Sequence, residues 1–389
     1  MSTLKVDTIT KADGTGSLSV PAESGTVVTT ASPSLGRRNL IINGAMQVAQ
    51  RGTSETGVTA SGYYTVDRWL YSTGGEETVT IEQSTDAPSG FGLSYKTTIT
   101  TADGTLDSSD YATINQRIEG QNLQGIAKGT SDAKPLTVSF WVKGSATGTY
   151  ICELYDGDNT RQVSASYTID SANTWEYKTI TFPADTSGSF DNDSNASLYV
   201  QFVLAGGSSF TSGTLNTSWA SSTNANRWVG QTNLIGTLNA TFQITGVQLE
   251  VGSVATPFEH RSYGEELALC QRYFYDTRDL QQSTNGTNNY MELQGTRHAF
   301  ADVVGYRGQT FTHPVVMRTN PTVTFYNPNN SMTSGQVQFY AADGSTQNFN
   351  AGLFVKKYAM YFWAYTGVTV GSTGQSVVCN VHWMADAEL

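Results

Sequence analysis

The spacing of apolar residues changes within residues 242–274, and this change constrains the fold more than any other feature of the chain. Apolar and polar residues alternate up to Val251, with a slip of one residue at Gly246. Such a slip at a glycine is typical of a β-bulge. Ser262, with Glu265 three residues later, is typical of a capping box at a helix start. The pattern therefore predicts a strand that closes one β-domain and a helix that follows it.

A short helix is predicted over residues 261–275, because the apolar positions there recur at helical spacing. They fall on one stripe, which consists of Tyr263, Leu267, Cys270 and Phe274. The stripe spans about three turns, which is shorter than a self-sufficient coiled coil. One interpretation is that it packs against the β-domains of its own chain.

The composition favours an all-β protein on both sides of this helix. Only 14% of the 389 residues are charged, where about 25% is typical, and the chain is rich in the Thr, Tyr, Phe and Trp that strands prefer. Strands separated by Gly, Asp, Asn and Ser predict a β-sandwich over residues 38–260, namely Leu136–Lys143, Thr149–Tyr155, Trp175–Phe182 and Leu198–Leu204. Further strands predict a second β-domain over residues 276–389, namely Thr322–Tyr326, Gln336–Tyr340, Gly352–Tyr365 and Ser376–Met384.

Residues 1–37 differ from the rest because they contain no aromatic residue and only short apolar runs. A segment this poor in apolar bulk builds no core of its own. We expect an extended segment in which Leu4–Ile9 adds as an edge strand to another chain, since strand addition depends on main-chain hydrogen bonds. The alternative is a flexible tail.

Charge and cysteine usage exclude several classes of function. The net charge is −11, with no basic cluster longer than Arg37-Arg38 or Lys356-Lys357, so nucleic-acid binding is not predicted. No apolar run approaches the ~20 residues that span a bilayer, and the N-terminus lacks the pattern of a signal peptide. Three scattered cysteines, Cys152, Cys270 and Cys379, predict buried thiols rather than a zinc site, and no metal or other cofactor is expected.

Three stretches resemble virion proteins of tailed bacteriophages. The segment GVQLEVGSVATPFEHRS, continued by CQRYF, resembles a junction of tail-fibre and other virion proteins, and residues 37–53 with 62–71 resemble the opening of the same module. Residues 1–17 resemble the N-termini of structural proteins from cyanobacterial phages. The resemblance implies a tail fibre or other peripheral appendage, made in the host cytoplasm and docked to other virion proteins by residues 1–37. It also implies a homotrimer, in which the stripe of the helix would face the threefold axis.

Residues 38–260 resemble the jelly-roll fold of carbohydrate-binding modules, in which a polar face with aromatic residues holds the glycan. Alternation places Trp141, Tyr199 and Gln201 on polar strand faces, opposite apolar ones. Trp219 and Trp228 lie in a Ser/Asn-rich stretch that is a candidate binding loop. The alternatives are that Trp141 belongs to the core and that the other two tryptophans close the end of the sandwich. The resemblance implies host-surface polysaccharide as the partner.

Catalysis and calcium binding have weaker sequence support. The carboxylates of Glu76, Glu77, Asp103, Asp107, Asp110 and Glu153 cannot be paired across a glycosidic bond from sequence. The runs at Asp156–Asn159 and Asp191–Asp193 lack full EF-hand spacing, and turn chemistry accounts for them. A non-enzymatic protein is therefore expected. The alternatives are a structural capsid or neck component without a ligand, and a polysaccharide depolymerase.

Overall fold

The computed structural model describes residues 9–10, 17–18, 38–277, 291–300, 303–327, 333–341, 346–350, 352–364 and 376–389. The chain forms two compact units, Met1–Arg38 and Asn39–Leu389. In the first unit, β1 (Ile9–Thr10) pairs with β2 (Ser17–Leu18). The rest of the predicted docking segment lies outside the described residues.

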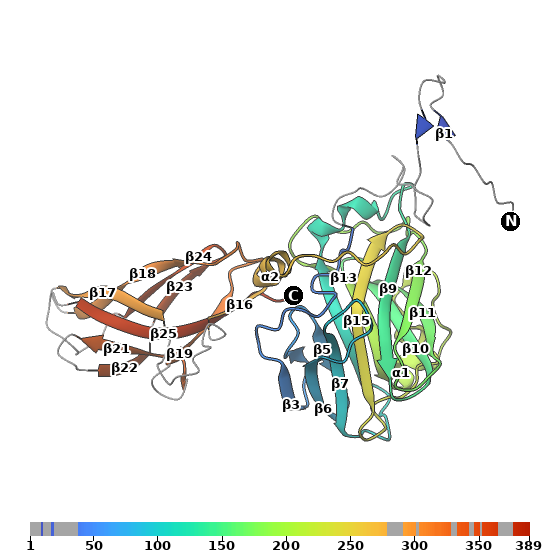
Figure 1. The fold of residues 1–389 in the computed structure, drawn as a ribbon, viewed down its shortest axis with the longest axis horizontal. Helices are drawn as coiled ribbons and strands as arrows, with labels where there is room; N and C mark the ends of the chain where they lie inside the picture. Colours follow the sequence, from blue (N-terminus) through green and yellow to red (C-terminus); the bar gives the residue numbers. More distant parts are fainter. Residues whose placement is uncertain are drawn as a thin grey trace. The chain divides into compact units, whose positions relative to one another are not determined.

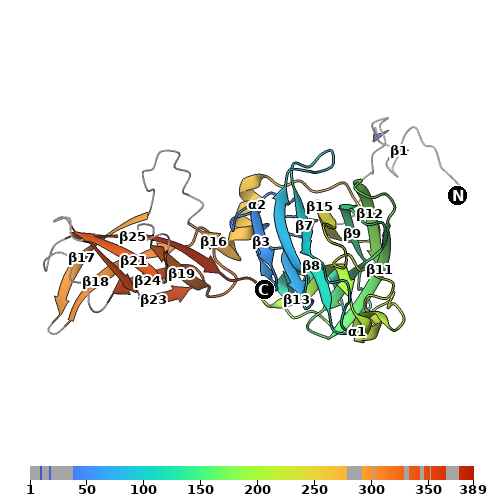
Figure 2. The same ribbon diagram turned by 90° about the horizontal axis from the view of Figure 1, so that it is seen from below.

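Two antiparallel sheets face each other in the larger unit and form a sandwich (Figure 1 and Figure 2). The seven-stranded sheet has the order β14 (Ala220–Ser221), β11 (Arg161–Ile169), β10 (Gly148–Asp156), β13 (Ala196–Gly206), β8 (Tyr111–Glu119), β5 (Leu70–Thr73) and β4 (Gly62–Tyr63). The six-stranded sheet has the order β12 (Glu176–Phe182), β9 (Leu136–Gly144), β15 (Thr241–Val251), β7 (Ser94–Thr101), β6 (Thr78–Ser84) and β3 (Ser54–Val58).

The core lies between the two sheets and is built by alternation. Every second residue of β9 from Leu136 to Val142 is buried in it, and so is every second residue of β13 from Leu198 to Leu204. The rings of Phe140 and Phe202 meet across the two sheets, with centroids 4.8 Å apart. The all-β sandwich expected from the sequence is confirmed.

The predicted bulge lies in β15. The register with β9 shifts between Thr245 and Gln248, and Gly246 has a φ of +61°. A Cβ at Gly246 would lie 2.6 Å from the ring of Phe91, so both the backbone angle and the neighbouring ring require glycine.

The helix is shorter than predicted. The structure has α2 over Tyr263–Gln271, and Ser262 caps it by accepting a hydrogen bond of 3.3 Å from the backbone N–H of Glu265. Phe274 is not helical, because it begins β16 (Phe274–Asp276), which pairs with the last strand of the chain. The expected stripe is therefore not continuous: Cys270 and Phe274 are buried, whereas Tyr263 is 56% exposed.

The C-terminal β-domain is organised around its last strand, which pairs with four others. Its strands are β16, β17 (Met291–Phe300), β18 (Val303–Thr312), β19 (Thr322–Asn327), β20 (Thr333–Ser334), β21 (Gln336–Ala341), β22 (Thr346–Asn350), β23 (Gly352–Lys356), β24 (Ala359–Ala364) and β25 (Ser376–Asp386). The single strand predicted over Gly352–Tyr365 is wrong. Lys356 pairs with Ala359, so the chain reverses over the exposed polar turn between them and forms a hairpin.

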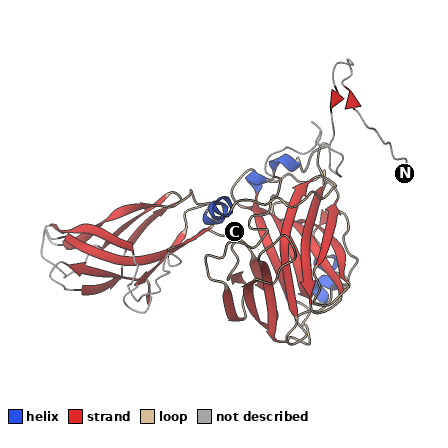
Figure 3. Ribbon diagram, in the orientation of Figure 1, coloured by secondary structure: helices blue, strands red, loops and turns tan. Residues whose placement is uncertain are grey.

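The remaining helices are short and lie in connections between strands (Figure 3). They are η1 (Gly120–Asn122), η2 (Gln124–Ile126), α1 (Ser208–Thr211) and η3 (Asn224–Asn226). Within the part of the chain that the structure describes, no helix is long and apolar enough to cross a membrane.

Candidate functional site

The candidate residues lie on opposite sides of the sandwich. Trp141 belongs to β9 of the six-stranded sheet, whereas Tyr199 and Gln201 belong to β13 of the seven-stranded sheet. All three alternate with core residues, so each points away from the core. The structure therefore brings Tyr199 and Gln201 together and separates them from Trp141.

An aromatic pair lies on the outer face of the six-stranded sheet. Trp141 is directly opposite Tyr177 of the edge strand β12, and antiparallel neighbours in register point to the same side. Their ring centroids are 5.4 Å apart, with the planes tilted by 50°. Tyr177 is 47% exposed and Trp141 is half-buried beside it. One edge of the sandwich therefore offers two adjoining aromatic surfaces to solvent.

Hydroxyl groups continue this surface along the same two strands. Thr179 pairs with Ser139 and Thr181 pairs with Thr137, and the outward side chains of Thr179 and Thr181 are exposed. The hydroxyls of Thr137 and Thr181 lie 3.1 Å apart. We name this surface the β9–β12 face and define it by Trp141, Tyr177, Thr179 and Thr181.

Asp86, in the loop before β7, organises the border of the β9–β12 face. Its carboxylate accepts hydrogen bonds from Lys143 Nζ at 2.7 Å, from the indole N–H of Trp175 at 3.1 Å and from Gln243 Nε2 at 3.2 Å. The hydrogen bond from Lys143 holds the pKa of Asp86 below its usual value. The same loop packs on β15, where the Thr245 hydroxyl donates to the Leu93 carbonyl. The loop therefore lies over β15 and holds Trp175 by its indole N–H.

Polar side chains on the outer face of the seven-stranded sheet form hydrogen bonds with one another. Gln201 is almost fully buried and donates to Glu153 at 2.8 Å. The same carboxylate binds the guanidinium of Arg227 through two hydrogen bonds, at 2.9 and 2.7 Å. Tyr199 packs edge-to-face on Tyr155, with centroids 5.6 Å apart. These contacts stabilise the sheet and occupy the groups that a ligand would need.

The two tryptophans of the Ser/Asn-rich stretch are held against the sandwich. Trp228 is only 2% exposed, belongs to a cluster with Ile151 and Val203, and donates its indole N–H to Glu153 at 3.2 Å. Trp219 donates to the Pro183 carbonyl at 2.9 Å and packs against the main core. Trp228 therefore packs on the outer face of the seven-stranded sheet, and Trp219 packs against the main core.

The sequence reasoning missed Tyr177, Trp175 and Asp86. The alternation through Ile180 and Phe182 would have placed Tyr177 on the outward side of its strand, so a signal for it was present. Asp86 gave no such signal, because it reaches Lys143 from a loop distant in sequence.

The carboxylate of Asp156, in the acidic turn, already binds other groups of the protein. It accepts hydrogen bonds from Lys128 Nζ at 2.5 Å and from the Asn159 N–H at 3.0 Å. Within the described ranges, no group of three or more His, Cys, Asp or Glu residues is arranged to hold a metal ion.

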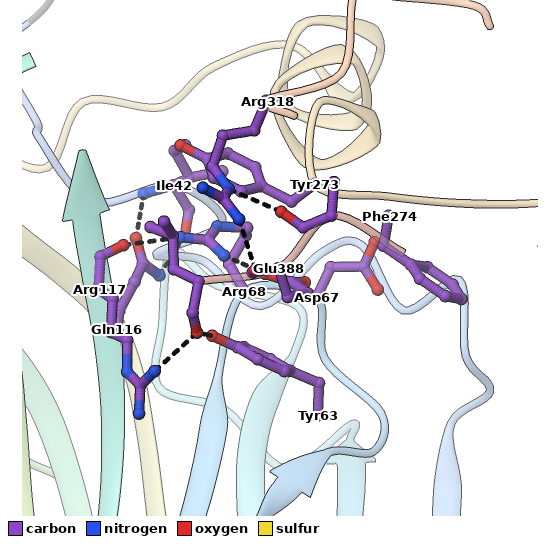
Figure 4. Close-up of polar contacts among 12 residues, drawn as sticks. Ile42, Tyr63, Asp67, Arg68, Gln116, Arg117, Tyr273, Phe274, Arg318 and Glu388 are labelled. Carbon is purple, nitrogen blue, oxygen red and sulfur yellow. Dashed lines mark hydrogen bonds and ion pairs between the residues drawn. The ribbon is translucent and has the colours of Figure 1, made fainter. Parts of the chain in front are cut away.

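Four arginines bind the last described residues, and Figure 4 shows three of them, Arg68, Arg117 and Arg318. Arg68, which is 1% exposed, and Arg51 pair with Glu388, and Arg318 donates to the carbonyls of residues 387 and 388 at 2.7 and 2.9 Å. The Leu389 carbonyl accepts from Arg117 and Tyr63, at 2.8 and 3.1 Å. We name this set the arginine clasp: Arg51, Arg68, Arg117 and Arg318.

The clasp also involves two residues that follow α2. The guanidinium of Arg68 lies 3.5 Å from the ring centroid of Tyr273, and that of Arg51 lies 3.5 Å from the ring centroid of Phe274. Burial raises the pKa of the adjacent Asp67 to about 6, against the opposing charge of Arg51. Cys270 and Phe274 are thus packed against their own chain.

Comparison with known proteins gives partial likenesses to solved structures. No family model matches the chain, and no curated protein matches it either. The enzymatically active domain of tailspike protein 4 of bacteriophage CBA120 is 16% identical, with a TM-score of 0.31, over 55% of this chain and 21% of that chain. TmCBM61 in complex with beta-1,4-galactotriose is 10% identical, with a TM-score of 0.29, over 55% and 99%. The family 11 carbohydrate-binding module of Clostridium thermocellum, in complex with a mixed-linked tetrasaccharide, is 15% identical, with a TM-score of 0.27, over 52% and 98%.

Proposed function

We propose that this protein binds carbohydrate through the β9–β12 face. The observation that carries the proposal is the pair of half-buried Trp141 and exposed Tyr177, with hydroxyl side chains continuing along the same strands. Sugar rings present C–H surfaces that pack on aromatic rings and hydroxyls that pair with polar side chains. Binding sites combine these two kinds of group, an apolar lining and a few placed polar groups.

We propose binding without catalysis, and the carboxyl group beside the face supports this. Glycoside hydrolysis needs a carboxylic acid whose pKa is raised, so that it donates a proton near neutral pH. The pKa of Asp86 is lowered by its hydrogen bond from Lys143. Asp86 is therefore a poor proton donor.

We place the protein on a phage particle, as a tail fibre or other peripheral appendage. The support is the sequence resemblance at residues 1–17, at residues 37–53 with 62–71, and at residues 246–274. The N-terminal segment would dock to other virion structural proteins, and a homotrimer would present several β9–β12 faces to host-surface polysaccharide. Several weak sites joined in one assembly gain avidity without any new contact. Light scattering of the purified protein tests the trimer.

The test of carbohydrate binding compares Trp141→Ala and Tyr177→Ala with Tyr358→Ala, which removes another exposed tyrosine, in the C-terminal domain. Loss of one stacking surface worth about 1.4 kcal/mol corresponds to roughly tenfold weaker binding to host-surface polysaccharide. The first two variants should show this loss and the third should not, with all three folded by circular dichroism. Unchanged binding in all three variants would overturn the assignment to this face, and absence of binding by the wild type would favour a purely structural component. Release of reducing sugar by the wild type would favour a depolymerase.

A further inference from the structure

The charged groups that border the β9–β12 face are paired with one another. Lys143 Nζ lies 2.7 Å from Asp86. Farther across the same outer side of this sheet, Lys96 Nζ lies 3.1 Å from Glu82. Each of the two lysines thus faces one carboxylate at short range, and the local charge is balanced.

This pairing works against an acidic ligand. A carboxylate or phosphate on a sugar gains affinity when it meets a cation that is not already neutralised. At this face it would have to displace Asp86 from Lys143. A polyanion would also approach a chain whose net charge is −11, and like charges repel at long range.

The uncharged groups of the face extend along one strand direction. Tyr177, Thr179 and Thr181 project from the same side of β12, and a strand advances by about 3.4 Å per residue. The Cα atoms of Tyr177 and Thr181 are therefore about 14 Å apart along the strand. This length exceeds one pyranose ring, so the face suits successive sugars of a chain better than a single terminal sugar.

We propose that the β9–β12 face takes an uncharged polysaccharide and contacts at least two consecutive sugar residues. One sugar stacks on the Trp141–Tyr177 pair, and the next forms a hydrogen bond with the hydroxyl of Thr179. This inference rests on the proposed function, because it specifies the ligand of the same site.

Affinity electrophoresis tests the ligand class. The gels contain one of three neutral polysaccharides (β-1,4-galactan, mixed-linked β-glucan or xylan) or one of two acidic ones (polygalacturonate or alginate). We expect at least one neutral polymer to retard the protein, the acidic polymers not to, and Trp141→Ala to lose the retardation. Binding measured in solution should be the same at low salt and at about 1 M NaCl, where the Debye length is about 3 Å.

Each other result of this experiment overturns a defined part of the proposal. Retardation only by an acidic polymer, weakened by salt and lost in Trp141→Ala, would keep the site and overturn the ligand class. Absence of retardation by all five polymers would overturn the proposed function together with the inference.

The second sugar contact is tested by Thr179→Val, which removes the hydroxyl but keeps a β-branched side chain, and by Thr179→Ser, which keeps the hydroxyl. We expect the valine variant to bind the neutral polymer several-fold more weakly than the serine variant. Equal affinity of the two variants would overturn the two-residue contact and leave the stacking site in place.

Discussion

At the scale of single residues, Gly246 shows how two constraints meet at one position. Its φ of +61° is unfavourable for other residues, and the Phe91 ring occupies the space that a side chain would need. Both constraints come from the bulge. It shifts the alternation of β15, so that apolar side chains on both sides of it point into the core. The residue that the sequence marked as a slip is thus fixed by its surroundings as well as by its backbone.

Gly246→Ala should therefore lower the free energy of unfolding by about 2–4 kcal/mol, as the sum of backbone strain and a steric clash. Gly230→Ala is the matched control, because Gly230 has a φ of +89° but no atom within 4 Å of an added Cβ. It should lose only the strain, about 1 kcal/mol. Urea denaturation of both variants measures the difference, and equal losses would show that Phe91 moves aside without cost.

A second prediction at the scale of single residues concerns Glu119 and the pH dependence of stability. It is buried, yet hydrogen bonds from Arg272 and Tyr273 outweigh burial and lower its pKa below the usual 4.5. A carboxyl whose pKa is lowered by folding stabilises the native state above pH 4.5, and this contribution disappears as pH falls through the native pKa. Glu119→Gln should be less stable than the wild type at pH 7, and the difference should shrink between pH 5 and pH 3. A constant difference across this range, measured by urea denaturation, would contradict the assignment.

At the scale of elements, α2 is a short helix whose start is encoded locally and whose end is not. Ser262 caps the first turn through the Glu265 N–H, as its sequence predicts. The helix stops at Gln271 because the following residues reach β25 and pair with it, which offers more hydrogen bonds and burial than another helical turn. An end set by tertiary pairing explains why the stripe of four residues is divided.

Ser262→Ala should lower stability by about 0.5–1 kcal/mol, since the cap satisfies one N–H at an exposed helix start. Ser262→Asp should retain most of that contribution, because its carboxylate also accepts from the first turn and favours the helix dipole. Thermal unfolding measures both variants. If alanine and aspartate behaved alike, the cap would not contribute.

At the scale of the whole molecule, the C-terminal β-domain is joined to the sandwich by two segments that lie side by side. The chain leaves the sandwich through α2 and β16, and β25 returns beside β16 to the arginine clasp. Buried ion pairs are sensitive to the loss of one partner, because the other is left charged in a poorly solvated place. Loss of one partner of the arginine clasp should therefore lower the stability of this junction strongly.

Glu388→Gln should destabilise the junction by about 3 kcal/mol, because it leaves the buried guanidinium of Arg68 without its partner. The matched control is Asp386→Asn, whose carboxylate is 42% exposed and pairs with Arg51 at 3.3 Å; it should cost less than about 1 kcal/mol. Hydrogen exchange of β16 and residues 381–389 reports the effect. Equal protection in the two variants would show that the Arg68–Glu388 pair does not hold the junction.

The sequence alone determined the all-β class, the bulge, the capped helix start and the outward sides of β9 and β13. These features are local, because alternation reports which side of its own strand a residue occupies. Only the tertiary structure decided which strands became neighbours. It placed Tyr177 against Trp141, put Tyr199 on the opposite outer face, and made Phe274 a strand residue by pairing it with Asp386. Strand pairing depends on hydrogen bonds and packing between distant segments, and a local pattern does not specify that choice.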